Sequence, residues 1–360
     1  AVDVYWTENS ENSIDPISKE KDFEGYRIYK SAFGFDTRSN LDLQNSYELV
    51  GEWDKKGNAI GFDTGLETIR LAKDTSFEGD TIKYLLDYKE GKIKEGLGIG
   101  CGLDDYLRFK RKQLNIILGH DNVGKTYWIN WYFLVLALKH GLKFCLWSGE
   151  NQKGQILRDL IQMYAGEPFK NLTAQQIQSY LGYLEQFFYF VDNSKLYKPL
   201  ELLAIFESSG CDVALIDPFT GLDREMTYEG NYTFMNKARE FVNRTGMTIY
   251  INTHPNTESG RSGNLYTEGD WKGHLKPPLK DHIEGGKAFL NRCDDMFVIH
   301  RLIKHEEMKY KTMVGVEKVK DMDTGGKHTG LNEQVLCNFN YGLGFEVYGV
   351  NPIEVIKHGF

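Results

Sequence analysis

The stretch Leu114–Trp128, LNIILGHDNVGKTYW, has an apolar run followed by Gly119, Gly124, Lys125 and Thr126 in the spacing G-x-x-x-x-G-K-T. The apolar run predicts a buried strand, and the residues after the second glycine open a helical pattern. Backbone N–H groups of such a loop surround phosphate oxygens, the lysine neutralises charge, and the threonine hydroxyl binds Mg²⁺. The sequence therefore predicts a site for ATP, or another nucleoside triphosphate, with Mg²⁺.

Three further strand-like runs end in residues that suit this chemistry. DVALIDPFTG places four apolar residues before Asp217, as expected for a carboxylate on the magnesium side of the site. KFCLWSGEN places Glu150 at its end, where it can orient the attacking water, and MTIYINTHP places His254 where it can contact the γ-phosphate. The carboxyl ends of parallel strands meet at one crevice, so these side chains should converge on the phosphate loop. The structural alternatives are a turn aspartate, a helix-capping glutamate and a satisfied histidine.

From about residue 95 onward, continuous apolar runs alternate with helical stretches such as TYWINWYFLVLALKHG and GQILRDLIQMYAG. This alternation is typical of a parallel sheet that helices cover on both faces. The expected fold class is therefore α/β, with a nucleotide-binding domain over residues 95–360.

The earlier part of the chain has a different pattern. Residues 1–74 contain short aromatic and β-branched runs, VDVYW, EGYRIYKS and YELVGEW, which predict β structure. Residues 75–94 place Ile82, Leu85 and Leu86 at helical spacing, which predicts a short linker helix. Its apolar face packs either on its own domain or on a neighbouring subunit. The expected units are a β-rich segment (1–74), a linker helix (75–94) and the nucleotide-binding domain (95–360).

The words VDVYWTENS and DFEGYRIYKS, in this order, resemble the second and third strands of a fibronectin type III-like sandwich. The resemblance covers about half of such a module, which is often used for binding or as a spacer. A lone half-sandwich leaves open strand edges. Either a partner completes it, or the segment belongs to a fusion or an incompletely represented domain.

Charge and cysteine usage narrow the range of partners. The net charge is −8, so a polyanion must be met by a local basic patch rather than by a global positive field. The five cysteines lie far apart without metal-ligand spacing, which favours reduced thiols and a cytoplasmic location. No apolar run reaches the roughly 18 residues that span a bilayer, so no membrane contact is expected.

Four features in this order resemble the RecA-like ATPase domain of DnaB-type hexameric replicative helicases, including phage primase-helicases. They are GHDNVGKT, the strand end LWSGEN, the strand end LIDPFTG, and a strand ending in His254 before a long loop. Downstream, IEGGKAFLNRCDDMFVIHR and VGVEKVKDMDTGGKHTG look like the family's next helix, acidic pair, strands and basic hairpin. The resemblance runs from about residue 80 to 348.

The resemblance implies roles for individual residues. Lys125, Thr126 and Asp217 would bind the nucleotide and Mg²⁺, Glu150 would activate water, and His254 would sense the γ-phosphate. A basic residue of the late hairpin would reach into the neighbouring subunit's site. That residue here is Lys320, where the family usually has an arginine, and a lysine lacks the planar bidentate fork.

The family also binds single-stranded DNA with loops that face the central channel of a ring. The segment 256–287, NTESGRSGNLYTEGDWKGHLKPPLKDHIEGGK, interleaves basic residues with Tyr266 and Trp271, and such residues can contact phosphates and stack on bases. A solvated, charged loop is the alternative. The candidate DNA-binding residues are Arg261, Lys272, Lys276, Lys280 and Lys287.

Together these features predict an ATP-dependent replicative DNA helicase that translocates on single-stranded DNA as a ring, with a hexamer expected. A phage or mobile-element origin would place it in the host cytoplasm, with a primase or loader as partner. One alternative is a RecA-superfamily ATPase that acts in recombination or repair without unwinding. Another is a structural or binding protein that works through its β-rich segment.

Overall fold

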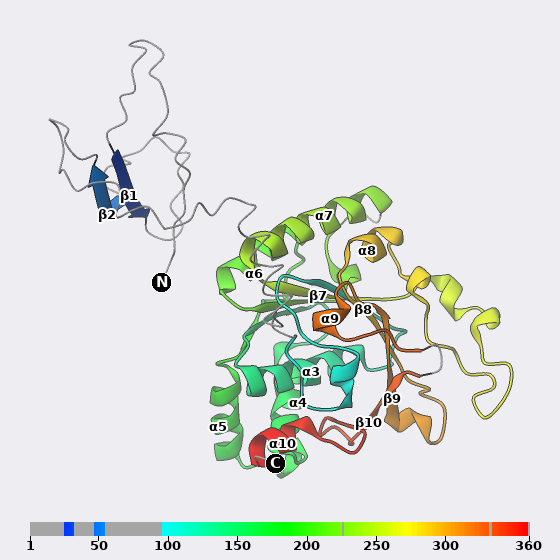
Figure 1. Cartoon of the computed structure of the whole chain (residues 1–360). Coiled ribbons are helices and arrows are strands. Elements are labelled where there is room, and N and C mark those ends of the chain that lie inside the picture. Colours follow the sequence, from blue (N-terminus) through cyan, green and yellow to red (C-terminus); the bar gives the residue numbers. More distant parts are fainter. Residues whose placement is uncertain (1–24, 32–46, 55–95, 225–226, 331–332, 359–360) are drawn as a thin grey trace. The chain divides into compact units, whose positions relative to one another are not determined.

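The computed structural model describes residues 25–31, 47–54, 96–224, 227–330 and 333–358 (Figure 1). The chain divides into two compact units, Ala1–Ile93 and Lys94–Phe360. The run VDVYW and the expected linker helix at 75–94 lie outside the described residues. The division into three segments and the fibronectin-like resemblance therefore stay predictions.

Two strands of the N-terminal unit are described, β1 (Gly25–Ser31) and β2 (Tyr47–Asp54). They pair antiparallel, with a register shift between Ile28 and Tyr29. Both coincide with runs that the sequence predicts as β structure, EGYRIYKS and YELVGEW.

The C-terminal unit is built on a nine-stranded sheet of order β11-β10-β9-β8-β3-β7-β6-β4-β5. The six strands from β8 to β5 run parallel, as the alternating sequence pattern predicts. The strands β9, β10 and β11 extend the sheet antiparallel beyond β8. The strands are β3 (Leu114–Leu118), β4 (Phe144–Ser148), β5 (Phe188–Phe190), β6 (Val213–Asp217), β7 (Thr248–Thr253), β8 (Met296–His300), β9 (Lys311–Lys318), β10 (Val335–Phe339) and β11 (Phe345–Val347).

Helices cover both faces of this sheet and make two separate apolar cores. In Figure 1, α3, α4, α5 and α10 lie on one side of the strands, and α6, α7 and α8 lie on the other. The helices are α3 (Lys125–His140), α4 (Lys153–Ala165), α5 (Ala174–Leu184), α6 (Pro199–Ser209), α7 (Tyr228–Thr245), α8 (Lys287–Arg292), α9 (Met322–Gly325) and α10 (Pro352–His358).

Helix α3 fixes the position of the phosphate loop. It is apolar almost all round, and every residue from Trp128 to Ala137 is buried, as expected of a helix inside a core. Trp128 stacks on Tyr132 at 5.5 Å between ring centroids. A helix held on all sides in this way keeps its N-terminus, where the phosphate loop ends, fixed against the carboxyl edge of the sheet.

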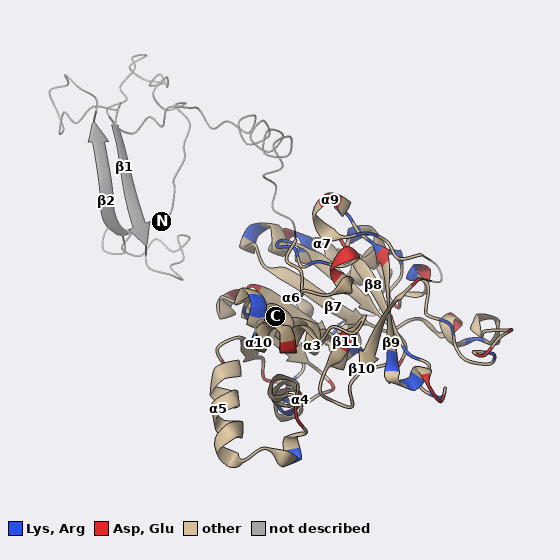
Figure 2. Ribbon diagram, turned by 60° about the horizontal axis from the view of Figure 1, so that its bottom comes forward, with Lys and Arg blue, Asp and Glu red and all other residues tan. Residues whose placement is uncertain are grey.

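Charged residues of both signs are interspersed along the C-terminal unit (Figure 2). This distribution agrees with the absence of a global positive field that the net charge of −8 implies. Within the described ranges, the helices are too short or too polar for any of them to cross a membrane.

Candidate active site

The phosphate loop joins β3 to α3, and both glycines of its motif are sterically required. Gly124 has a φ of 89°, in the left-handed region that favours glycine. A Cβ on Gly119 would clash with the carbonyl oxygen of Ile299. The loop therefore runs against the adjacent strand β8 and enters the helix through a turn that only glycine makes without strain.

Lys125, the first residue of α3, is buried at the floor of the site. Its Nζ donates hydrogen bonds to the carbonyl oxygens of Gly119 and His120, both at 2.8 Å. Burial lowers the pKa of Lys125, whereas the neighbouring carboxylates Asp217 and Asp121 raise it. The ammonium group thus lies inside the loop that should hold phosphate, next to acidic side chains.

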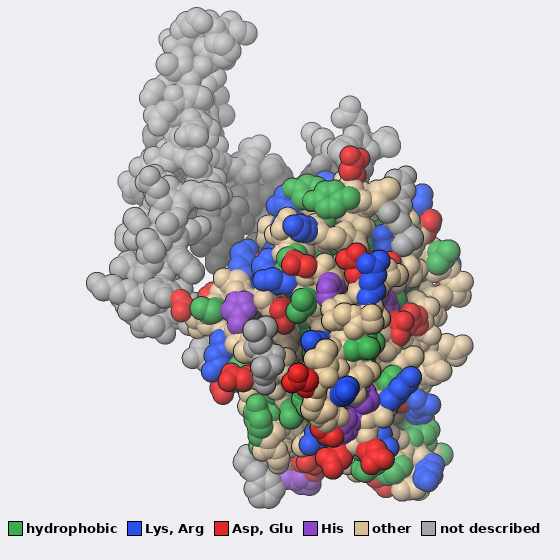
Figure 3. All heavy atoms as spheres, turned by 90° about the vertical axis from the view of Figure 1, so that its right-hand side faces the viewer, with side chains coloured by type: hydrophobic (Ala, Val, Ile, Leu, Met, Phe, Trp, Pro, Cys, Tyr) green, Lys and Arg blue, Asp and Glu red, His purple; other side chains and the backbone are tan. Residues whose placement is uncertain are grey.

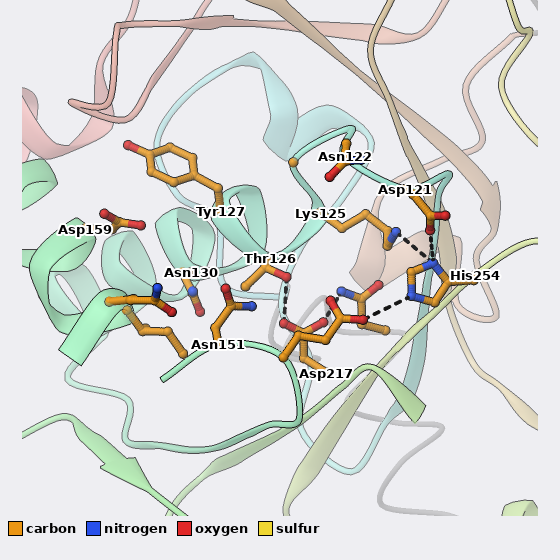
Figure 4. Close-up of a pocket in the computed structure, with 15 residues that line it drawn as sticks. Asp121, Asn122, Lys125, Thr126, Tyr127, Asn130, Asn151, Asp159, Asp217 and His254 are labelled. Atoms are coloured by element: carbon orange, nitrogen blue, oxygen red, sulfur yellow. Dashed lines mark hydrogen bonds and ion pairs between the residues drawn. The ribbon is translucent and has the colours of Figure 1, made fainter. Parts of the chain in front are cut away.

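Asp217, at the end of β6, is held by two side chains from other elements. The Thr126 hydroxyl donates to its Oδ2 at 2.7 Å, and Asn252 of β7 donates to its Oδ1 (Figure 4). Burial raises the pKa of Asp217, and these two hydrogen bonds lower it. A hydroxyl and a carboxylate oxygen side by side are hard ligands of the kind Mg²⁺ prefers, so the pair fits the ion.

Glu150 and His254 face each other across the same space. His254 Nε2 lies 4.0 Å from Oε1 of Glu150, and its Nδ1 lies 2.7 Å from Oδ1 of Asp121. The Lys125 Nζ is 3.5 Å from the same Nδ1 (Figure 4). The Glu150 side chain is 62% exposed, which leaves its carboxylate open to solvent in the cavity.

These groups line one cavity of about 520 Å³. The sequence-predicted residues Lys125, Thr126, Glu150, Asp217 and His254 all lie there, as expected from the meeting of parallel strand ends. The cavity extends between α3 and α4, and its remaining polar lining residues are Asp121, Asn122, Asn130, Asn151, Gln155, Asp159 and Asn252.

Two of the residues that build this site were missed by the sequence reasoning. Asn252 holds Asp217, and its only signal is an amide in the middle of an otherwise apolar strand, MTIYINTHP. Asp121 holds His254, and it occupies one of the variable positions of the phosphate-loop motif. Both contacts join segments that are far apart in the sequence, so spacing alone could not reveal them.

Lys320 is not among the described residues that line this cavity. Its Nζ lies 2.9 Å from Oδ1 of Asp294, and its side chain is 64% exposed. The neighbouring Lys318 is anchored more firmly, because its Nζ donates to the carbonyls of Leu290 and Cys293 at 2.7 Å. A contribution of Lys320 to a neighbouring subunit's site stays a prediction.

The candidate DNA-binding residues are spread over the segment 256–287. Lys272 and Lys276 belong to one hairpin, whereas Lys280 lies in a 3₁₀ turn and Lys287 begins α8. Arg261 is exposed and lies 3.6 Å from Glu258. In Figure 3, which shows the face that carries much of this segment, Lys and Arg alternate with Asp and Glu.

The two aromatic residues of this segment pack inside it. Tyr266 and Trp271 meet edge to face, with ring centroids 5.2 Å apart. Both rings also pack against a small apolar cluster that contains Leu302, Met308 and Met313. Their packing stabilises the hairpin, which leaves less of each ring available for stacking on bases than the sequence suggested.

No family model matches the sequence. Among curated proteins, the chain is similar to the Twinkle homolog protein, chloroplastic/mitochondrial, of Arabidopsis thaliana, with 24% identity over 227 residues. The match covers 57% of this chain and 30% of that protein, so the chain spans about a third of this relative's length.

Solved structures give a wider match. A separately solved ATPase domain of a DnaB-like replicative helicase superposes with a TM-score of 0.59 at 12% identity, covering 78% of this chain and all of that one. A second DnaB-like replicative helicase, solved in a study of its interactions with primase, gives 0.58 at 12% identity, covering 76% of this chain and 67% of that one. The C-terminal unit thus has the RecA-like fold of the ATPase domains of DnaB-like replicative helicases.

Proposed function

We propose that this chain, whose C-terminal unit has the fold of DnaB-like helicase ATPase domains, is the motor of a replicative DNA helicase. It would hydrolyse ATP or another nucleoside triphosphate and translocate on single-stranded DNA. The observation that carries the proposal is the convergence of the side chains from four strand ends on one cavity. These side chains are Lys125, Thr126, Glu150, Asp217 and His254.

The geometry supports a division of labour in hydrolysis. Lys125 would leave the loop carbonyls to bind the β- and γ-phosphates, while Thr126 and Asp217 hold Mg²⁺. Bound Mg²⁺ supplies charge stabilisation on the phosphate oxygens. Glu150 would accept a proton from water as the water oxygen bonds to the γ-phosphorus and the bond to the β–γ bridging oxygen breaks.

His254 is placed to report the state of the γ-phosphate. It contacts Asp121 of the phosphate loop and lies near Glu150. It also stands directly before the segment 256–287 that carries the candidate DNA-binding residues. A change in its contacts on hydrolysis would therefore reach that segment first.

The charge of the cavity supports a site completed by another subunit. Its described lining contains the carboxylates Asp121, Glu150, Asp159 and Asp217 but a single lysine, Lys125. A triphosphate adds further negative charge, so additional cations are needed. Mg²⁺ would supply part of this charge, and Lys320 of a neighbouring subunit would supply more after leaving Asp294. A closed ring, with a hexamer expected, provides such neighbours.

DNA and protein partners follow from the same proposal. Arg261, Lys272, Lys276, Lys280 and Lys287 would contact the phosphates of one strand, and copies around a ring would concentrate this modest charge. A primase or a loader is the expected protein partner, and a phage or mobile element the expected source.

The test is strand displacement on a forked duplex with ATP and Mg²⁺. We expect unwinding by the wild-type chain and its loss in Lys125→Ala, whose triphosphate affinity should also fall. Lys237→Ala is the matched control, since Lys237 is exposed on α7 and pairs with Glu240. ATPase activity that single strands stimulate without displacement would favour the recombination-type ATPase. A Lys125→Ala variant with unchanged nucleotide affinity and turnover would leave only a structural or binding role.

A further inference from the structure

A second cavity, of about 180 Å³, adjoins the phosphate loop. It lies among three segments: the phosphate loop, the chain that leaves β8, and a hairpin spanning residues 264–276. The hairpin is defined by a bridge between Leu265 and Leu275 and by hydrogen bonds from Lys276 to Asn264 and from Tyr266 to His274. The imidazoles of His120 and His300 both line the cavity.

His300, the last residue of β8, anchors the hairpin. Its Nε2 lies 3.0 Å from the carbonyl oxygen of Leu275, and a carbonyl only accepts, so Nε2 carries the proton. Burial lowers the pKa of His300 to about 4, so the ring is neutral at pH 7. Its buried Nδ1 has no hydrogen-bond partner among the described residues. The ring is thus committed to the hairpin through one atom.

His120, in the phosphate loop, lies against the next residue of the hairpin. Burial lowers the pKa of His120, whereas a polar contact with the backbone of Lys276 raises it. The rings of His120 and His300 meet edge to face with centroids 5.9 Å apart. Two neighbouring imidazoles from different segments therefore contact two consecutive residues, Leu275 and Lys276.

The backbone of His120 points the other way, into the active site. Its carbonyl oxygen accepts a hydrogen bond from Lys125 Nζ at 2.8 Å. A phosphate bound in the loop competes for this ammonium group and weakens its hold on the carbonyl. A continuous set of contacts thus runs from the position of the phosphates, through His120, to the hairpin.

The hairpin is packed well enough to move as a unit. Asp270 lies 3.0 Å from Nε2 of His305, and Tyr266 and Trp271 pack on the apolar cluster of Leu302, Met308 and Met313. It carries Lys272 and Lys276, two of the candidate DNA-binding residues. A small displacement at its base would therefore move both lysines together.

We propose that His120 and His300 couple the phosphate loop to the hairpin 264–276, so that nucleotide binding repositions Lys272 and Lys276. By thermodynamic reciprocity, a strand bound to the hairpin changes nucleotide affinity by the same factor. His120 and His300 are positioning residues, and the proposal rests on the proposed function only in requiring a triphosphate in the phosphate loop.

The test is hydrogen–deuterium exchange of the full chain with and without the magnesium complex of a non-hydrolysable ATP analogue. We expect the analogue to change exchange rates within residues 264–276 by roughly two- to thirtyfold in the wild type. His300→Leu, which removes the donor to Leu275, should lose most of this change. His300→Gln, which keeps an N–H donor at a similar reach, should retain it, and the exposed, distant His358→Leu is the control.

Analogue affinity is measured on the same samples with a fluorescent ATP derivative, and we expect it to stay within about threefold across these variants. Failure of the wild type to bind the analogue would overturn the proposed function and the coupling together. Binding without any change in the hairpin would overturn the coupling alone, as would an unchanged response in a folded His300→Leu. If that variant does not fold, His300→Asn, which is polar but has no atom at the Nε2 position, gives the same decision.

Discussion

Asp217 carries an electrostatic cost that its proposed role explains. It is buried at the end of β6, and its pKa is raised because the charged form loses solvation. A buried anion next to a hydroxyl is unfavourable for the folded chain, and a bound divalent cation relieves that cost. The residue is thus suited to metal binding at the expense of stability.

Asp217→Asn should therefore uncouple stability from activity. We expect a melting temperature at or above that of the wild type, by roughly 2–4 °C for each kcal/mol gained, and a loss of hydrolysis. The hydrogen bonds can be kept, since the Asn252 amide can turn its buried Oδ1, which lacks a partner among the described residues, toward the new NH₂ group.

The pH dependence of this difference has a definite sign. Because the folded pKa of Asp217 is raised, its destabilising effect is absent below the ordinary pKa and complete above the folded value. The stability advantage of Asp217→Asn should grow as pH rises through that range. Thermal melts over a pH series measure this, with the exposed Asp223→Asn as control. An advantage that shrinks with pH would contradict the assignment.

Glu150→Gln should separate nucleotide binding from turnover. The amide keeps the size of the side chain but cannot accept the proton of the attacking water, so we expect turnover to fall about 100-fold or more. Nucleotide affinity, measured by fluorescence titration, should change by less than about threefold. Glu185→Gln, an exposed position paired with Lys153, is the control. Normal turnover in Glu150→Gln would remove this residue from the mechanism.

At the level of single residues, strand-end chemistry could be predicted and its supports could not. Glu150, Asp217 and His254 end apolar runs in the sequence, and their runs are β-strands that end at one cavity. Asn252 and Asp121 act through contacts across the sheet, where a residue's partner depends on strand order. One sequence does not reveal that order, so both residues looked ordinary.

Among the elements, α3 couples the core to the site most directly. Trp131 is fully buried in this helix, and its ring lies 5.2 Å from that of Phe345 in β11. It therefore ties the phosphate-loop helix to the antiparallel edge of the sheet. Loss of this side chain opens a cavity that the surrounding rings cannot fill.

Trp131→Ala should destabilise the C-terminal unit by about 3–5 kcal/mol. Urea unfolding followed by circular dichroism gives the free energy, and nucleotide affinity should fall in parallel as the helix loosens. Leu196→Ala provides the control, because Leu196 is 73% exposed and its loss should cost less than about 0.5 kcal/mol. Equal stabilities of the two variants would mean that α3 is not held by this contact.

Elements with a strong pattern were predictable, whereas those defined by distant contacts were not. The parallel strands carry continuous apolar runs, such as LNIIL and VALID, and follow the sequence prediction. The hairpin 264–276 lacks such a run, and Tyr266 and Trp271 looked like exposed base-stacking residues. Their packing on Met308 and Met313 depends on chain segments some 40 residues later, which no local pattern indicates.

At the scale of the whole molecule, the acidic cavity and the exposed Lys320 lead to a prediction about mixed assemblies. If Lys320 acts on a neighbour's site, adding Lys320→Ala to wild-type chain should lower activity more steeply than the fraction of variant added. Steady-state ATPase rates over a mixing series measure this. Lys327→Ala is the matched control, since Lys327 lies over the ring of Tyr106. A decline strictly proportional to the variant fraction would confine the defect to its own subunit.

The two edges of the nine-stranded sheet limit how copies of the molecule can join. The outermost strands, β5 (Phe188–Phe190) and β11 (Phe345–Val347), have only three residues each. Such short edges present few free backbone groups, so sheets of different molecules have little template for pairing into fibrils. A protein that must gather in several copies around one strand can then be present at high local concentration and still assemble through side chains alone.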